Sequence, residues 1–144
     1  MALTDHTRRA AAPDLRRTTA LVVGDVVAFN LVTALGLYRH GELTDLGALG
    51  QVVQVAAPFL ASWLLVAPFL GAFRRDVVER PPQLLARSAL AWLVALPIGL
   101  MLWSLMRQRQ VQPTFAAVTF ITNLVVLLGW RGVFAMLASR GRRR

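Results

Sequence analysis

The sequence predicts an all-α integral membrane protein, a four-helix bundle whose helices run up and down across a bilayer. Its 144 residues are 56% hydrophobic and only 16% charged, an apolar share above that of a soluble domain. The apolar residues fall into four runs of roughly 20 residues, the length that crosses a ~30 Å hydrocarbon core. A helix satisfies its backbone hydrogen bonds in lipid, and short connections make neighbouring helices antiparallel.

Charged and turn-forming segments separate the four runs. The spans are expected at about 18–38, 51–73, 84–106 and 113–137. A polar tail, residues 1–17, precedes them, and a basic tail, residues 138–144, follows. Pro81 and Pro82 suit a helix start, because the first turn of a helix does not need their missing N–H groups. The third span is therefore expected to begin close to these prolines.

The basic residues predict the orientation in the membrane. All 16 are arginines, and the absence of lysine beside so much Ala, Leu and Val suggests a GC-rich prokaryotic genome. Twelve arginines lie in the tails or around the connection between the second and third spans, against three in the other connections. This bias predicts a prokaryotic cytoplasmic membrane with both termini on the cytoplasmic side. Since the arginines lie at the ends of apolar runs and not on a polar face, their expected partner is the lipid bilayer and not nucleic acid.

Two charged residues lie inside the expected spans. A charge costs roughly 2.5–3.5 kcal/mol or more at the bilayer centre, so it usually faces a partner or water. By helical rise, Asp25 lies about 8 Å and Arg131 about 9 Å from the same membrane boundary. The sequence therefore predicts an ion pair between the first and fourth spans.

A second polar layer is expected near mid-membrane. Asn30 and Thr33 fall there on the first span, and Thr119 and Asn123 on the fourth. Trp130 and Arg131 share the helical face of the latter two, which is consistent with hydrogen bonds between the two spans. All these residues can hold neighbouring helices together by polar contacts, or Asp25 can carry a proton or ion. A neighbouring arginine favours the charged carboxylate, which suits a structural contact better than proton transfer.

Five further residues are candidates for lining a ligand cavity: Trp63, Trp92, Trp130, Pro58 and Pro97. Trp63 and Trp92 fall deeper than an interfacial aromatic belt, and an indole N–H in hydrocarbon needs an acceptor. A carbonyl freed by a proline inside a helix is one possible acceptor. Tight packing is the preferred interpretation of the tryptophans, and helix bending that of the prolines.

The sequence contains no recognisable catalytic or cofactor-binding motif. It has no cysteine, which excludes disulfides and thiolate metal sites within this chain. His40 and Glu42 bring a histidine and a carboxylate together after the first span, and two ligands are too few for a structural metal site. We therefore expect no metal, no cofactor and no enzymatic activity.

Several short motifs resemble a known family, domain of unknown function 3054, which comprises small prokaryotic membrane proteins. The motifs are Gly24-Asp25, His40-Gly41-Glu42, Pro58-Phe59-Leu60 with Trp63, Pro97-Ile98-Gly99-Leu100, Phe115, and Leu128-Gly129-Trp130-Arg131. The resemblance covers about residues 18 to 137, and the Gly-Trp-Arg segment is its most specific part. It implies a multi-span membrane protein and brings no established activity.

These observations favour a structural or accessory membrane subunit that self-associates or joins a larger complex. Small residues along the second span offer a close-packing face for another helix: Ala56, Ala57, Ala61, Ala67 and Gly71. One rival is a proton- or ion-coupled transporter or channel, formed by a homo-oligomer and working through Asp25. Another is a lipid- or pigment-binding protein. A water-filled crevice at Asp25 would favour transport, and a dry contact with Arg131 would favour the structural subunit.

Overall fold

The computed structural model describes residues 15–42 and 48–140. These residues form five helices and no strand: α1 (Leu15–Arg39), α2 (Ala48–Phe69), α3 (Arg75–Val78), α4 (Pro81–Arg107) and α5 (Pro113–Arg140). The four longer helices are each long and apolar enough to cross a membrane. The predicted all-α membrane bundle is thereby confirmed. The outer parts of the two expected tails, 1–14 and 141–144, lie outside the described residues.

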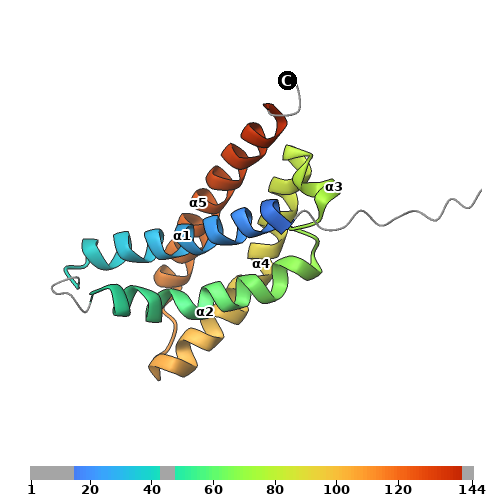
Figure 1. The fold of residues 1–144 in the computed structure, drawn as a ribbon. Helices are drawn as coiled ribbons and strands as arrows, with labels where there is room; N and C mark the ends of the chain where they lie inside the picture. The colour runs from blue at the N-terminus through green and yellow to red at the C-terminus, as the bar shows by residue number, and fades with distance from the viewer. Residues whose placement is uncertain (1–14, 43–47, 141–144) are drawn as a thin grey trace, which may run out of the picture.

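The four long helices form two antiparallel hairpins, α1–α2 and α4–α5, and the second crosses the first obliquely (Figure 1). Between the hairpins, α2 packs along α4 and α1 packs against α5. Each long helix therefore contacts its neighbours in the sequence, and the first and last helices close the ring. This arrangement places the inner face of α1 against α2 and α5.

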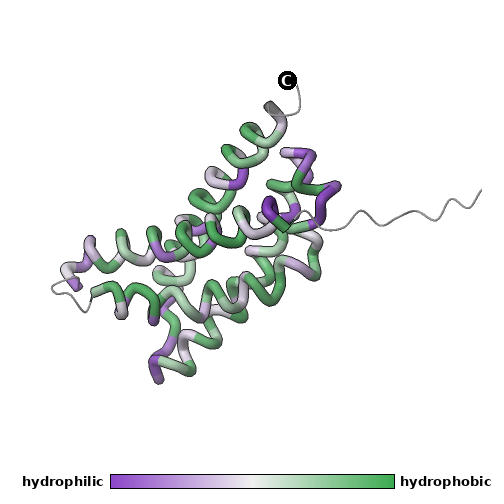
Figure 2. The backbone as a smooth tube through the Cα atoms, in the orientation of Figure 1, coloured by the Kyte–Doolittle hydropathy of each residue, from purple (hydrophilic) through white to green (hydrophobic). Residues whose placement is uncertain are grey.

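Polar and apolar residues are separated along the bundle. Hydrophobic residues dominate the four long helices, and hydrophilic ones gather around α3 and at the connections (Figure 2). On α1 a stripe of large aliphatic side chains points outward with a spacing of four residues: Val23, Val27, Leu31 and Leu35, each more than half exposed. Such a stripe suits contact with lipid chains, because water would leave it unfavourably solvated.

Helix α2 ends at Phe69, four residues before the expected end at residue 73. Gly71 has a φ of 73°, the left-handed conformation that glycine adopts without strain. The Ala72 N–H then donates to the Ala67 carbonyl at 2.9 Å, and the Gly71 N–H to the Pro68 carbonyl at 3.0 Å. These bonds make a Schellman cap that turns the chain away from the helix axis. The charged connection beyond it is not a plain turn, because it contains the short helix α3.

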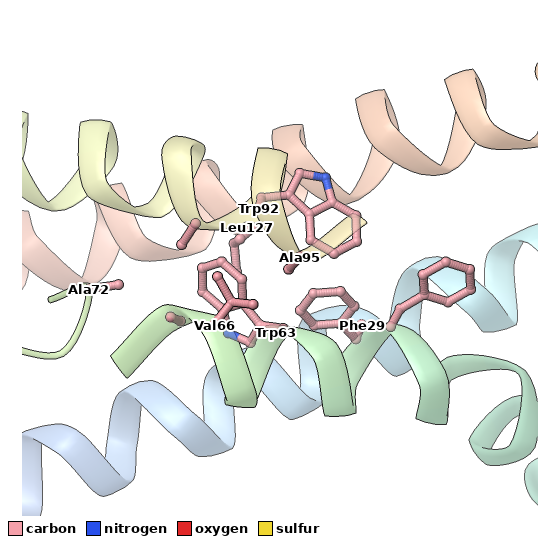
Figure 3. Close-up of a cluster of buried hydrophobic side chains, with 10 residues drawn as sticks. Phe29, Trp63, Val66, Ala72, Trp92, Ala95 and Leu127 are labelled. Atoms are coloured by element: carbon pink, nitrogen blue, oxygen red, sulfur yellow. The ribbon is translucent and has the colours of Figure 1, made fainter. Parts of the chain in front are cut away.

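An aromatic cluster fills the interior between α2 and α4 (Figure 3). Phe29 enters it from α1, Trp63 from α2 and Trp92 from α4, and the Phe29 and Trp92 rings meet edge to face with centroids 5.2 Å apart. Gly99 allows the close approach of α4, since a Cβ there would lie 2.8 Å from Cδ1 of Phe59. Dense packing of this kind holds the helices at fixed distances.

Candidate functional site

Asp25 and Arg131 form an ion pair between α1 and α5, and both side chains are fully buried. Arg131 Nη2 donates to Asp25 Oδ2 at 2.6 Å, and Arg131 Nε donates to Oδ1 at 3.1 Å. The planar guanidinium thus engages both carboxylate oxygens, the bidentate geometry that gives such pairs their strength. The structure brings together the two charges whose depths match in the sequence.

The remaining polar contacts of Arg131 lead to other parts of the bundle. Its Nη1 donates to the Ala72 carbonyl, just beyond the end of α2, at 2.9 Å and to Ser88 Oγ on α4 at 3.0 Å. Ser88 in turn donates to the Leu84 carbonyl at 2.6 Å. One guanidinium therefore joins three of the long helices and the connection after α2. A buried arginine requires this many acceptors, because each unpaired N–H would be left desolvated.

Trp63 completes the site from α2. Its Nε1 donates to Asp25 Oδ2 at 3.0 Å, so the expected proline-freed carbonyl is not its acceptor. The Arg131 guanidinium carbon lies 4.9 Å from the Trp63 ring centroid and 4.7 Å from that of Phe73. Both rings therefore offer cation–π attraction to the charge. We call Asp25, Trp63, Ala72, Ser88 and Arg131 the polar node.

Gly24 allows α1 and α5 to approach beside the polar node. A Cβ at this position would lie 1.9 Å from Cζ2 of Trp130, well inside van der Waals contact. The Trp130 indole therefore occupies the space that any larger residue would need. The neighbouring residues Gly24 and Asp25 of α1 thus engage Trp130 and Arg131 of α5 as two adjacent pairs.

The second polar layer does not link the helices as expected. Asn30 donates to the Val26 carbonyl at 2.8 Å, Thr33 to Phe29 at 2.9 Å and Asn123 to Thr119 at 3.0 Å. Each acceptor lies four residues earlier on the same helix. Short side chains reach this carbonyl more easily than a neighbouring helix, so the predicted interhelical hydrogen bonds are not formed among these described residues.

The other candidate residues differ in their surroundings. The Trp92 N–H donates to the Phe120 carbonyl of α5 at 3.0 Å, an acceptor that no proline frees. Pro58 is buried, whereas Pro97 is exposed on the outside of α4. Within the described part of the chain, the buried Nε1 of Trp130 and Oδ1 of Asn30 have no hydrogen-bond partner. The indole N–H groups of Trp63 and Trp92, by contrast, each have a hydrogen-bond acceptor within the protein.

Sequence reasoning missed Ser88 and the Ala72 carbonyl as partners of Arg131. The depth estimate that pairs Asp25 with Arg131 also applies to Ser88. It lies seven residues beyond the start of α4 at Pro81, or about 10 Å along the helix, close to the level of the ion pair. The Ala72 carbonyl could not be found in this way, because its position depends on the glycine cap after α2.

The polar node is closed to solvent. Its donors and acceptors are matched to one another, and its two charged side chains have no exposed surface. Residues 15–42 and 48–140 also contain no group of three His, Asp or Glu side chains that could hold a metal ion. The arrangement holds four helices in one register and leaves no carboxylate directed at solvent.

The comparisons with known proteins bear on the family alone. No curated protein and no solved structure matches the sequence. The model of a family described as a protein of unknown function, DUF3054, matches residues 22–134. This segment contains both halves of the ion pair and all of the polar node. The chain therefore belongs to the DUF3054 family.

Proposed function

We propose that this protein is a non-enzymatic structural or accessory subunit of the prokaryotic cytoplasmic membrane. It acts as a rigid four-helix unit that self-associates or joins a larger membrane complex, with both termini on the cytoplasmic side. The observation that carries the proposal is the dry ion pair: Asp25 and Arg131 are both 0% exposed, and their polar contacts are with the protein.

The same observation argues against the rival transporter. A carboxylate that carries a proton or cation must be reached by water from one side at a time. Asp25 instead accepts Arg131 on both oxygens and the Trp63 N–H on Oδ2. Releasing it would require α1, α2 and α5 to separate at once, which a packed core resists.

Proton flux in proteoliposomes separates the two functions. We compare the wild type with Asp25→Asn/Arg131→Gln, a double variant that removes the carboxylate without leaving an unpaired charge. A structural subunit predicts the same proton leak as protein-free liposomes for both proteins. Flux through the wild type that the folded double variant lacks would overturn the proposal.

Native mass measurement after purification in a mild detergent tests the assembly directly. We expect a defined oligomer, or a complex with a stoichiometric partner, that persists in the double variant. A wild-type protein that is monomeric both in detergent and in lipid nanodiscs, with no stoichiometric partner, would contradict a role in assembly.

Single-cysteine labelling tests the orientation, because the chain has no cysteine of its own. His40→Cys and Asp76→Cys place exposed thiols at opposite ends of the bundle. In intact cells a membrane-impermeant maleimide is expected to label position 40 alone, and position 76 after permeabilisation. The reverse pattern would place both termini outside.

A further inference from the structure

One end of the bundle carries a surplus of positive charge. There α1 begins, α2 ends and α4 begins, and α3 lies between the last two. Its described residues include six arginines and two carboxylates, a surplus of four charges: Arg16, Arg17, Arg74, Arg75, Arg80 and Arg87 against Asp76 and Glu79. We call this set the arginine-rich end.

The two carboxylates are shared among only some of the arginines. Asp76 Oδ1 accepts a hydrogen bond from Arg74 Nε at 3.2 Å. Glu79 Oε1 lies 3.4 Å from Arg17 Nη1 and 3.4 Å from Arg75 Nε. Within the described part of the chain, Arg16, Arg80 and Arg87 have no carboxylate partner. The uncompensated charge therefore lies on side chains that are exposed at the ends of membrane-spanning helices.

Two of the six arginines flank the end of α2. Arg87, on the second turn of α4, donates through Nη1 to the Leu70 carbonyl at 3.2 Å, and its other N–H groups have no partner among the described residues. The Arg74 side chain runs over Gly71, where an added Cβ would lie 2.9 Å from its Cδ. The Arg87 side chain thus lies at Leu70, and the Arg74 side chain lies at the next residue, Gly71.

An exposed apolar surface adjoins these two arginines. Phe69, the last residue of α2, is 85% exposed, and Leu90, three residues after Arg87 on α4, is 46% exposed. A membrane-spanning helix presents such side chains to acyl chains, while arginines at its end lie at headgroup level. The combination of two arginines that flank the end of α2 and adjacent apolar side chains matches a phospholipid better than a free anion.

We propose that the seam between α2 and α4 at the arginine-rich end binds the phosphate of an anionic phospholipid. Arg74 and Arg87 contact the phosphate, and Phe69 packs against an acyl chain. Arginine suits this role because its planar fork of N–H donors matches phosphate oxygens. Asp76 neutralises part of the charge of Arg74, so Arg87 makes the larger contribution. The other arginines attract the negative lipid to the site.

The test measures how strongly purified protein retains one lipid relative to another. Protein in mild detergent receives equal amounts of phosphatidylglycerol and phosphatidylcholine with identical acyl chains, and bound lipid is counted by native mass spectrometry. The wild type is expected to prefer phosphatidylglycerol. Arg74→Gln/Arg87→Gln is expected to lose about tenfold or more of that preference, the size expected for two arginines near a lipid surface.

A matched variant removes the same charge from the opposite end of the bundle. Arg107→Gln/Arg109→Gln alters two exposed arginines, one at the last position of α4 and one just beyond it, and is expected to keep the wild-type preference. Equal losses in the two double variants would overturn the proposal, because net charge alone would then explain binding. Arg74→Lys/Arg87→Lys keeps the charges and is expected to retain an intermediate preference.

Two further measurements keep the proposal open to contradiction if the glutamine variant folds poorly. Phe69→Ser changes an almost fully exposed ring, and it is expected to lower retention of phosphatidylglycerol severalfold without changing the melting temperature in lipid-free detergent. Excess inorganic phosphate should displace little of the bound lipid. Complete displacement by inorganic phosphate, or unchanged lipid retention by Phe69→Ser, would show that the site does not recognise a lipid.

Discussion

Two polar layers on α1 and α5 look alike in the sequence and behave differently in the structure. In the first layer, Asp25 and Arg131 bond to each other across the bundle. They also bond to Trp63 of α2 and to Ser88 of α4. In the second, Asn30, Thr33 and Asn123 bond to carbonyls of their own helices. Both layers lie in helices that are apolar enough to span a membrane.

The difference follows from reach and from charge. An asparagine or threonine can satisfy its donor on the preceding turn of its own helix, so it does not need a neighbour. A carboxylate and a guanidinium offer no such local solution, because a buried charge needs an opposite charge and several hydrogen bonds. Helix register is therefore determined by the first layer, and the second layer is nearly independent of which helix lies beside it.

Breaking the ion pair from one side should produce the largest effect. Asp25→Asn and Arg131→Gln each leave one buried charge without its partner, which is expected to cost about 3–5 kcal/mol of folding free energy. The double variant should recover a large part of this loss. Detergent-titration unfolding of the purified proteins, followed by tryptophan fluorescence, measures all three. Additive losses in the double variant would show that the two charges do not depend on each other.

Separating α1 from α5 beside the ion pair should come next. Gly24→Ala introduces a Cβ that would lie 1.9 Å from the Trp130 ring, so the helices must move apart or the indole must rotate. We expect a loss of about 3 kcal/mol, the upper part of the range for overpacking. Gly36→Ala is the control, since a Cβ there meets nothing within 4 Å. Equal stability of the two variants would contradict the close contact.

A smaller effect is expected from the serine that joins α4 to the polar node. Ser88→Ala removes an acceptor of Arg131 Nη1 and should cost about 1–2 kcal/mol. Ser62 is equally buried, but its hydroxyl donates to the Phe59 carbonyl of its own helix. Ser62→Ala should therefore cost clearly less in the same titration. If Ser62→Ala proved the more damaging, the link from Arg131 to α4 would carry little of the stability.

The smallest effect should come from the second layer. Asn30→Leu removes a hydrogen bond within α1 and also an amide oxygen that lacks a partner among the described residues. The two changes oppose each other, so we expect a difference within about 0.6 kcal/mol of the wild type. A loss above about 2 kcal/mol would indicate that Asn30 binds across helices, and it would remove the contrast between the layers.

Helical rise was sufficient to predict the ion pair but not the rest of the polar node. With α2 ending at residue 73, Trp63 falls about 15 Å from the membrane boundary, far from Asp25. The cap at Gly71 ends the helix at Phe69, so Trp63 lies only six residues or about 9 Å from that end, and its Nε1 reaches Asp25. An error of four residues in one helix end was enough to conceal the contact.

The four spans could be predicted because length and hydropathy determine them without reference to tertiary structure. The partners of Arg131 depend on tertiary structure, since they come from three other segments of the chain. The prediction of hydrogen bonds between helices in the second layer was wrong for a related reason. Matching depth shows that two side chains can meet, and it does not show whether each already has an acceptor on its own helix.

The ion pair between α1 and α5 also has a consequence for biosynthesis. During translation the carboxylate of Asp25 is produced 106 residues before the guanidinium of Arg131. The Asp25 carboxylate of the first helix therefore lacks its arginine partner until the last helix has been synthesised. A chain that stalls before α5 is expected to keep the Asp25 carboxylate without its arginine partner, a costly state for a charge within the membrane.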